Sequence, residues 1–375
     1  MKTRLLLTLV PLILGMASCG GPSSDPAKEI TLTDAIGREL KIIPGSYKKV
    51  VCIGAGALRL YSYVGDANLL SGVEDIENMN AEGRPAMFDN AARPYVMANK
   101  DTYNTLPSCG KGGPQAQAAE AEKILSCKPD IVISEYEDVD KENALQEQLG
   151  VPVVTMRYGN GHSDFYNSLE ILGKVFGKED RAKALIDFDK AENKKIEDLT
   201  ANIPESERKN TYICGLGSWG TTNALMTAQD YRPLNLVHAN NIVTGLPKSG
   251  IQAIDQEKFE SLAPKMDVMI FDAAAVKNIQ GKAFDFSSCK AFTTGEVYLE
   301  MAYNAYFTNA EISLINTWFI GKSLYPSIFA DIDIETKANE ITEMFNGKEL
   351  YGEIKAMKMS YGGYQKIANP TEFFK

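Results

Sequence analysis

The feature that most constrains the fold is a pattern that occurs once in each half of the chain. An apolar run at residues 48–53 ends in a Gly-Ala-Gly turn at 54–56 and leads into helical spacing over 57–64. In the second half, the apolar run at 212–214 ends in a Gly-Leu-Gly turn at 215–217. A strand, a glycine turn and a helix in this order are typical of a parallel sheet covered by helices.

A second pattern is also repeated: a helical stretch, a proline and then a strongly apolar strand. In the first half it covers residues 118–133 around Pro129, and in the second half it covers 255–272 around Pro264. Apolar runs as continuous as these indicate buried strands. The two halves therefore predict an α/β protein with two Rossmann-like lobes, each built on a mainly parallel sheet.

Residues 161–203 separate the two halves and carry apolar side chains at helical spacing, with Lys and Glu alternating between them. This pattern is typical of a long helix with one solvated face. We therefore predict one long backbone helix, with a kink near 177–180, that joins an N-terminal lobe (30–160) to a C-terminal lobe (204–375). A cleft between two such lobes is a common place for a small ligand.

The N-terminus has the features of an export signal. Lys2 and Arg4 precede an apolar run at residues 5–16 that is too short to span a bilayer, and small residues stand directly before Cys19. This arrangement resembles the lipobox of bacterial lipoproteins, in which residues 1–18 are removed as a signal peptide and Cys19 carries the lipid. An ordinary cleaved signal with an incidental cysteine is the alternative interpretation.

The residues from Cys19 onward extend this prediction. Residues 19–29 begin with a Gly-, Pro- and Ser-rich stretch and predict a flexible, lipidated tether. No later apolar run approaches the roughly 20 residues that a membrane helix needs. We expect an exported protein that is lipid-anchored to the bacterial cell envelope, on the periplasmic side of an inner membrane or the outer face of a Gram-positive membrane.

Charge and histidine content narrow the choice of partners. The net charge of −10 becomes more negative once Lys2 and Arg4 are removed, which argues against nucleic acid or anionic lipid as a partner. The only histidines, His162 and His238, are far apart in the sequence, so we expect no site for a bare metal ion. We interpret His162 as a surface-loop residue, with a position facing the cleft as the alternative, and His238 as structural.

Five cysteines remain after Cys19. An odd number excludes a closed disulfide framework, and none of the spacings is a zinc pattern. Cys52 and Cys214 lie in apolar strand-like runs, where a thiol is expected to be a small buried hydrophobe. A disulfide between Cys109 and Cys127 is left open.

Short segments spread over the chain carry a resemblance to a known family. They are 32–38 (LTDAIGR), 54–59 (GAGALR), 72–77 (GVEDIE), 83–85 (GRP), 303–306 (YNAY) and 321–326 (GKSLYP). In this order, the segments resemble the helical-backbone class of ABC-transporter substrate-binding proteins, which serve iron-siderophore, haem and cobalamin uptake. Within that class they are similar to the HemV-like receptors for iron complexes.

The resemblance implies a receptor and not an enzyme. Such proteins are monomers that bind their ligand between the lobes, use no cofactor and pass the ligand to a permease dimer with a cytoplasmic ATPase. One glutamate at the outer tip of each lobe pairs with permease arginines, and the matching positions here are Glu122 and Glu257, each seven residues before a proline. Exposed ion pairs are worth about 0–1 kcal/mol each, so these glutamates would orient docking.

Ligand contacts are expected beyond the carboxyl ends of the parallel strands, where α/β proteins bind their ligands. Aromatic faces grip large chelates, and arginine binds and stacks on anionic ones. The residues at the expected strand ends are Arg59, Tyr136, Arg157, Tyr158 and Trp219. The resemblance adds Arg84, Tyr303 and Tyr306 by their position in the family.

Three segments match catalytic motifs only in part. Residues 215–220 fit GxGxxG after a strand, but the pattern is short and an exported protein meets no cytosolic nicotinamide pool. Gly321-Lys322-Ser323 ends like a P-loop, yet the leading glycine is replaced by Asn316. Ser218 has no glycine two residues before it and so is not a nucleophile elbow. We therefore expect no enzyme activity.

The sequence thus predicts a lipid-anchored receptor that captures an iron complex, either a siderophore or a haem-like ligand, and delivers it to an ABC permease. Three alternatives are kept. The first is a cobalamin receptor of the same class. The second is an exported enzyme or chelatase acting on a tetrapyrrole, with Tyr158, Tyr303 or His162 in its chemistry. The third is a surface lipoprotein that binds another protein.

Overall fold

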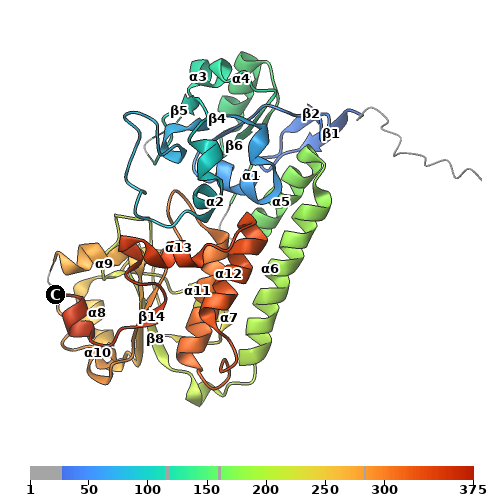
Figure 1. The fold of residues 1–375 in the computed structure, drawn as a ribbon. Coiled ribbons are helices and arrows are strands. Elements are labelled where there is room, and N and C mark those ends of the chain that lie inside the picture. Colours follow the sequence, from blue (N-terminus) through green and yellow to red (C-terminus); the bar gives the residue numbers. More distant parts are fainter. Residues whose placement is uncertain (1–27, 115, 117, 159–161, 283) are drawn as a thin grey trace, which may run out of the picture.

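The computed structural model describes residues 28–114, 116, 118–158, 162–282 and 284–375, and it shows two α/β lobes beside one long helix (Figure 1). The elements of the N-terminal lobe are β1 (Ile30–Thr33), β2 (Glu39–Ile42), β3 (Val50–Ile53), α1 (Ala57–Val64), β4 (Leu70–Glu74), α2 (Pro94–Tyr103), β5 (Ser108–Gly110), α3 (Ala121–Ser126), β6 (Ile131–Ser134), α4 (Val139–Leu149) and β7 (Val153–Thr155). The main sheet has the order β5-β4-β3-β6-β7 and is parallel throughout. Every residue of β3 and β6 is buried, because helices cover both faces of the sheet.

The C-terminal lobe repeats this architecture with one change at its edge. Its elements are β8 (Asn210–Cys214), β9 (Met226–Thr227), α7 (Arg232–Leu236), β10 (Asn240–Asn241), β11 (Gln252–Ala253), α8 (Gln256–Leu262), β12 (Val268–Asp272), α9 (Ala273–Gln280), α10 (Lys290–Thr294), β13 (Val297–Glu300), α11 (Ala310–Leu324), α12 (Ile334–Asn346), α13 (Tyr351–Ala356), β14 (Gln365–Lys366) and α14 (Pro370–Phe373). The sheet has the order β10-β8-β12-β13-β14, and only β14 runs antiparallel. The prediction of two lobes with mainly parallel sheets is confirmed.

The two glycine turns differ in the structure that follows them. In the N-terminal lobe, Gly54 and Gly56 take φ values of +89° and +102°, and α1 begins directly after them, as predicted. In the C-terminal lobe no helix follows the second turn, since the amide of Gly215 donates to the carbonyl of Met226 and the next helix begins only at residue 232. A Cβ on Gly215 would lie 2.2 Å from that of Ala275, so this glycine allows α9 to approach the strand.

The backbone helix is two helices, α5 (His162–Phe176) and α6 (Glu179–Thr200), and not one. Helix α5 ends because Gly177 takes the left-handed conformation, with φ +62°. The amide of Lys178 then donates back to the carbonyl of Gly173 at 2.7 Å. α5 and α6 pack against each other, and α6 alone, with 22 residues and a length of about 33 Å, runs along both lobes (Figure 1).

The two lobes share one hydrophobic core. Buried side chains of α1, α5, α6, α11 and α12 form a continuous cluster that extends to both sheets. Arg181 of α6 ties the lobes together as well, because it donates to the carbonyl of Tyr63 at 3.0 Å and to that of Met344 at 2.6 Å. Tyr63 in turn donates to Glu311 across the interface at 2.5 Å. The lobes are therefore packed on a common helical layer, which opposes wide hinge motion.

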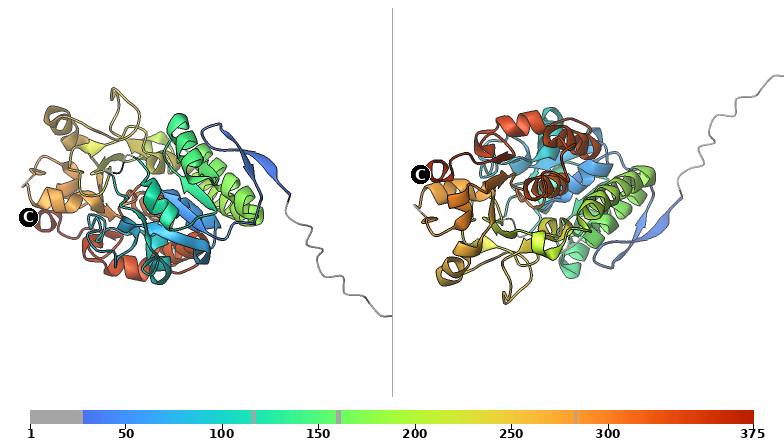
Figure 2. Two further views of the ribbon diagram at one scale, coloured as in Figure 1. Left: turned by 90° about the horizontal axis from the view of Figure 1, so that it is seen from above. Right: turned by 90° about the horizontal axis from the view of Figure 1, so that it is seen from below.

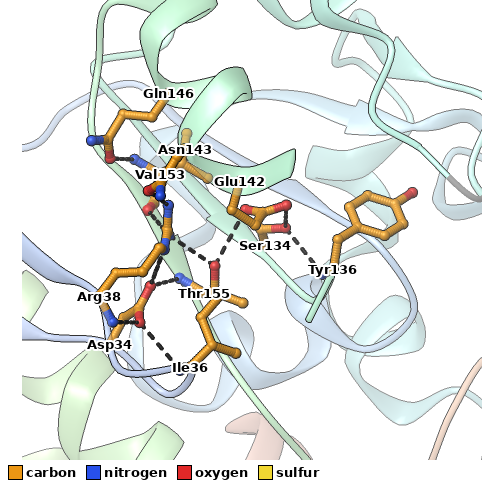
Figure 3. A network of polar contacts seen from close by, with 10 residues as sticks. All are labelled: Asp34, Ile36, Arg38, Ser134, Tyr136, Glu142, Asn143, Gln146, Val153 and Thr155. Atoms are coloured by element: carbon orange, nitrogen blue, oxygen red, sulfur yellow. Dashed lines mark hydrogen bonds and ion pairs between the residues drawn. The ribbon is translucent and has the colours of Figure 1, made fainter. Parts of the chain in front are cut away.

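A buried polar network fixes the N-terminal hairpin of β1 and β2 on its lobe (Figure 3). Arg38 forms an ion pair with Asp34 at 2.7 Å and also donates to Thr155, and both members of the pair are buried. Glu142 accepts from Ser134 and Thr155, and burial raises its pKa to about 7. Figure 2 shows the hairpin at the same edge of the molecule as α6.

The structure also bears on the predictions for the cysteines and for membrane-spanning helices. The five cysteines after Cys19 are buried free thiols, so Cys109 and Cys127 form no disulfide, and Cys52 and Cys214 are buried as expected. Cys19 itself, with the predicted signal and most of the tether, lies outside the described residues. Within the described part of the chain, none of the helices has both the length and the apolar character to cross a membrane.

Candidate ligand-binding site

A cavity of about 660 Å³ lies between the two lobes, beside α5 and α6. Pockets that bind small molecules usually measure about 300–1,000 Å³. Its lining combines Tyr158 after β7, His162 and Phe165 of α5, and Asp189 and Asn193 of α6 with residues of the C-terminal-lobe segments 228–233, 249–251 and 303–314. The cavity therefore draws on both lobes and on the helices that join them.

One wall of the cavity is a chain of polar contacts. Arg232 is exposed at the start of α7 and donates to Asn193 at 3.2 Å. Asn193 donates to Oδ2 of the buried Asp189 at 2.9 Å, and Tyr166 donates to the same oxygen at 2.5 Å. Nδ1 of His162 lies 3.1 Å from it. This wall offers a ligand the guanidinium of one arginine and the ring of one histidine.

Aromatic side chains also line the cavity. Tyr158 and Phe165 are stacked with their ring centroids 6.0 Å apart, and the rings of Tyr231 and Tyr303 are 6.2 Å apart. Burial raises the pKa of all three tyrosines, so their phenols stay neutral near pH 7. Neutral aromatic faces of this kind suit a large, partly apolar ligand.

A pair of buried carboxyl groups lies behind the tyrosines. Asp272 and Glu300 are paired at the carboxyl ends of β12 and β13, and both are fully buried. Glu300 accepts from the hydroxyl of Tyr231 at 2.9 Å. Burial raises the pKa of both carboxyl groups well above their usual range. Burial therefore disfavours a negative charge on either group.

Of the eight ligand contacts predicted from the sequence, Tyr158 and Tyr303 line this cavity. The other six are not among the residues that line it, and the protein itself fills part of the space beyond the strand ends. An apolar cluster of Ile76, Phe88 and Ala91 from one lobe and Ala305 and Tyr306 from the other occupies it, and Trp219 packs on this cluster.

Arg59 and Tyr306 are engaged in contacts between the lobes. Arg59 is fully buried, stacks on Tyr95 with its guanidinium carbon 4.5 Å from the ring centroid, and donates to the carbonyl of Ala305 at 2.8 Å. Tyr306 donates to Glu74 at 2.7 Å. Residues 303–309, which we call the clasp, therefore hold the C-terminal lobe on the N-terminal one.

Three further predicted contacts also have protein partners or lie at a distance from the cavity. Arg84 forms a two-point ion pair with Asp89, with both distances 2.7 Å. Arg157 donates to Glu137 at 2.7 Å. Tyr136 is half-buried against a separate apolar cluster of the N-terminal lobe. None of these three side chains is among the residues that line the cavity.

The sequence analysis missed the polar wall. Asp189 and Asn193 are four residues apart in a helix with many charged side chains, so their composition alone did not mark them as site residues. Their position in the helix could have done so, because they share its buried face with Ile186 and Ile196. Polar side chains on the apolar face of a helix need hydrogen-bond partners, and here these side chains line a cavity together with Arg232. His162, the first residue of α5, belongs to the same wall, so the alternative interpretation of a position facing the cleft holds and not that of a surface-loop residue.

The two glutamates predicted to meet the permease occupy matching places. Glu122 and Glu257 are each the second residue of a helix, α3 in one lobe and α8 in the other, and both are exposed. Among the described residues, no group of three or more His, Cys, Asp or Glu side chains could hold a metal ion.

Comparison with known proteins gives the class. Residues 85–285 match the model of the periplasmic binding protein family, so the chain belongs to that family. The family consists of solute-binding proteins and not of enzymes, which confirms the prediction of a binding protein and leaves no support for the alternative of an exported enzyme.

Individual relatives agree with this class. A stretch of 95 residues is 30% identical to YvrC, an uncharacterized ABC transporter substrate-binding lipoprotein of Bacillus subtilis (strain 168), and covers 24% of this chain and 30% of that protein. The match therefore spans less than a third of this curated relative.

Solved structures share the fold over almost their whole length. A periplasmic solute binding protein of Veillonella parvula has a TM-score of 0.67 at 17% identity, with 92% of this chain and 100% of that chain covered. The molybdate-bound MolA of Haemophilus influenzae has a TM-score of 0.65 at 17% identity, with 85% and 98% covered.

Proposed function

We propose that this protein is the substrate-binding component of an ABC importer, which captures an iron complex in the cavity between its lobes and passes it to a permease dimer with a cytoplasmic ATPase. The observation that carries the proposal is the cavity of about 660 Å³, which both lobes and the joining helices line. The iron complex is a siderophore or a haem-like chelate, and cobalamin is the alternative cargo.

The chemistry of the lining supports a chelated metal over a bare ion. The carboxylate of Asp189 already accepts from Tyr166 and Asn193, and both oxygens of Asp230 lie 3.0 Å from the amide of Gly250, which donates to them. A bare cation would have to compete with these donors, whereas a chelate brings its own ligands and presents an apolar surface to the tyrosines. The guanidinium of Arg232, which is exposed and lines the cavity, suits an anionic group on the chelator.

Delivery would use the two exposed glutamates. In this proposal Glu122 and Glu257 pair with arginines on the two halves of the permease, one from each lobe. The lipid on Cys19 keeps the receptor at the membrane surface, so docking takes place at a raised local concentration. Release follows when the permease stabilises a conformation of the lobes that binds ligand less well.

The test is titration of the body, residues 20–375, with ferric siderophores, haem and cobalamin, followed by calorimetry. We expect one iron complex to bind tightly, and Tyr303→Ala and Arg232→Ala to weaken binding at least tenfold. Arg157→Ala is the matched control, because it removes a predicted arginine that pairs with Glu137 outside the cavity. Failure of every iron complex to bind would refute the proposed cargo, and tight binding of cobalamin alone would establish the alternative.

A further inference from the structure

A loop of the C-terminal lobe forms part of the mouth of the cavity. It joins β10 to β11, and its residues Ser249, Gly250 and Ile251 line the cavity. Ser249 and Ile251 are also exposed to solvent, which places them at the mouth and not deep inside. We call residues 245–250 the mouth loop. A ligand that enters from solvent on this side of the cavity has to pass it.

Both ends of the mouth loop are glycines in a conformation that other residues rarely adopt. Gly245 has φ +69° and Gly250 has φ +78°. A Cβ at either position would meet no atom of the described residues within 4 Å, so neither glycine is needed for close packing. Glycine changes between left- and right-handed backbone conformations at little cost, and the hinge of a moving loop is a few positions that absorb such changes. The two glycines therefore suit the ends of a segment that swings.

The side chain of Gln229 holds the middle of the mouth loop. Its Oε1 accepts from the amide of Leu246 at 2.9 Å, and its Nε2 donates to the carbonyls of Leu246 and Lys248 at 3.2 and 3.1 Å. Gln229 is not among the residues that line the cavity. A substitution at this position therefore loosens the loop without changing the lining of the cavity.

Two other side chains hold the end of the loop. The carboxylate of Asp230 accepts from the amide of Gly250 at 3.0 Å, and the side chain of Gln252 donates to the carbonyl of Lys248. Apart from Leu246 and Gly250, which are partly buried, the residues of the loop are exposed. A segment held mainly by a few solvent-exposed hydrogen bonds opens at a lower free energy than the core of the protein.

We propose that the mouth loop is a lid on the ligand cavity. In the position seen it narrows the mouth, and it opens by rotation at Gly245 and Gly250 when the bonds to Gln229 and Asp230 break. The cargo of the proposed function is a chelate that must pass through this mouth, so opening of the lid would set the rates at which the cargo enters and leaves. The inference rests on the proposed function for the cargo, but not for the movement of the loop.

Amide hydrogen exchange of the ligand-free, untagged protein measures the opening. We expect residues 245–250 to exchange faster than the buried strand β8, and Gln229→Ala to speed their exchange by about tenfold, because it removes three hydrogen bonds. Trypsin should cleave this variant after Lys248 faster by a similar factor. The matched control is Gln256→Ala, because Gln256 bonds to Glu260 at 2.9 Å, away from the loop and the cavity. It should leave both rates unchanged.

Binding kinetics distinguish a lid from a loop that is merely loose. The probe is the iron complex that binds in the titration of the proposed function, followed by stopped-flow fluorescence. We expect Gln229→Ala to raise the association and the dissociation rate constants together, by about threefold or more, and to change the dissociation constant by less than about twofold. Loss of a direct contact to the ligand would instead change mainly the dissociation rate.

Two results would overturn the inference. One is exchange of residues 245–250 that Gln229→Ala leaves unchanged, and the other is unchanged binding kinetics in a variant whose loop exchanges faster. Failure of every iron complex to bind would refute the proposed function instead, and the exchange measurement alone would then decide whether the loop opens. The two failures are therefore distinguishable.

Discussion

Removing one hydroxyl from the clasp should weaken the protein in a way that depends on pH. Tyr306 donates to Glu74 at 2.7 Å and accepts from the amide of Gly113 at 3.0 Å, and the tyrosine is 3% exposed. A hydrogen bond to a charged group contributes about 1.5–3 kcal/mol, and a buried amide left without a partner costs about 1–3 kcal/mol. If the two contributions add, we expect Tyr306→Phe to lower the free energy of unfolding by about 2.5–6 kcal/mol.

The pH dependence follows from Glu74. Burial raises its pKa from the usual 4.5 to about 7, against the opposing effect of hydrogen bonds from Gly54 and Tyr306. The folded state thus holds a proton that the unfolded state releases, so this group lowers stability as the pH rises from about 4.5 to 7. Loss of the hydroxyl raises the pKa of Glu74 further, and the penalty of Tyr306→Phe should be larger at pH 8 than at pH 5.5.

Urea unfolding at these two pH values measures both effects. Tyr136→Phe is the matched control, because this half-buried tyrosine lies outside the clasp, and it should change stability by less than about 0.5 kcal/mol. A penalty below about 0.5 kcal/mol for Tyr306→Phe at both pH values, or one that is larger at pH 5.5, would refute the reasoning. The first result would mean that the hydroxyl of Tyr306 contributes little to holding the clasp on the N-terminal lobe.

Three further predictions concern other parts of the molecule. Glu300→Gln should stabilise the protein at pH 8 by about 1–3 kcal/mol and flatten the fall of stability with rising pH, since the raised pKa of this buried carboxyl marks a charge that the folded state disfavours; thermal unfolding from pH 5 to 8 measures it, and a less stable variant at pH 8 would contradict it. Arg38→Ala should cost about 3–5 kcal/mol in urea unfolding because it leaves Asp34 buried without its cation, and the double variant with Asp34→Ala should recover part of the loss; additive costs would contradict the pairing. Under the proposed function, Glu122→Lys and Glu257→Lys should reduce uptake in cells with little change in the ligand dissociation constant measured by calorimetry, and normal uptake by the double variant would exclude a docking role.

Most of the architecture could be read from the chain, because its signals are local. The apolar run after Pro264 became β12, and the helical spacing after the first glycine turn became α1. The backbone helix was placed correctly in the sequence but counted as one. Its break depends on the left-handed conformation of Gly177, which spacing alone indicated only as a kink.

The site was harder to predict, because the rule that ligands lie beyond the strand ends holds only while that space is empty. The strand-end rule placed Arg59 in that space and the family resemblance added Tyr306, and both side chains contact the other lobe there. The sequence did not show that side chains of the clasp fill this space. The cavity between the lobes lies beside α6 instead. Asp189 and Asn193 became part of the site only through contacts with Tyr166 and Arg232, which come from other parts of the chain.

The sequence by itself determined two α/β lobes with mainly parallel sheets, the helical connection between them and the class of receptor. These features follow from periodicity, turns and the order of motifs, which can be recognised in short stretches of chain. Only the tertiary structure decided which polar groups face one another. Residues 162 and 189 are 27 positions apart, and residues 74 and 306 are on different lobes, so their pairing depends on how the lobes pack on α5 and α6. That packing is a property of the whole core, and it decides where the cavity lies and which side chains reach it.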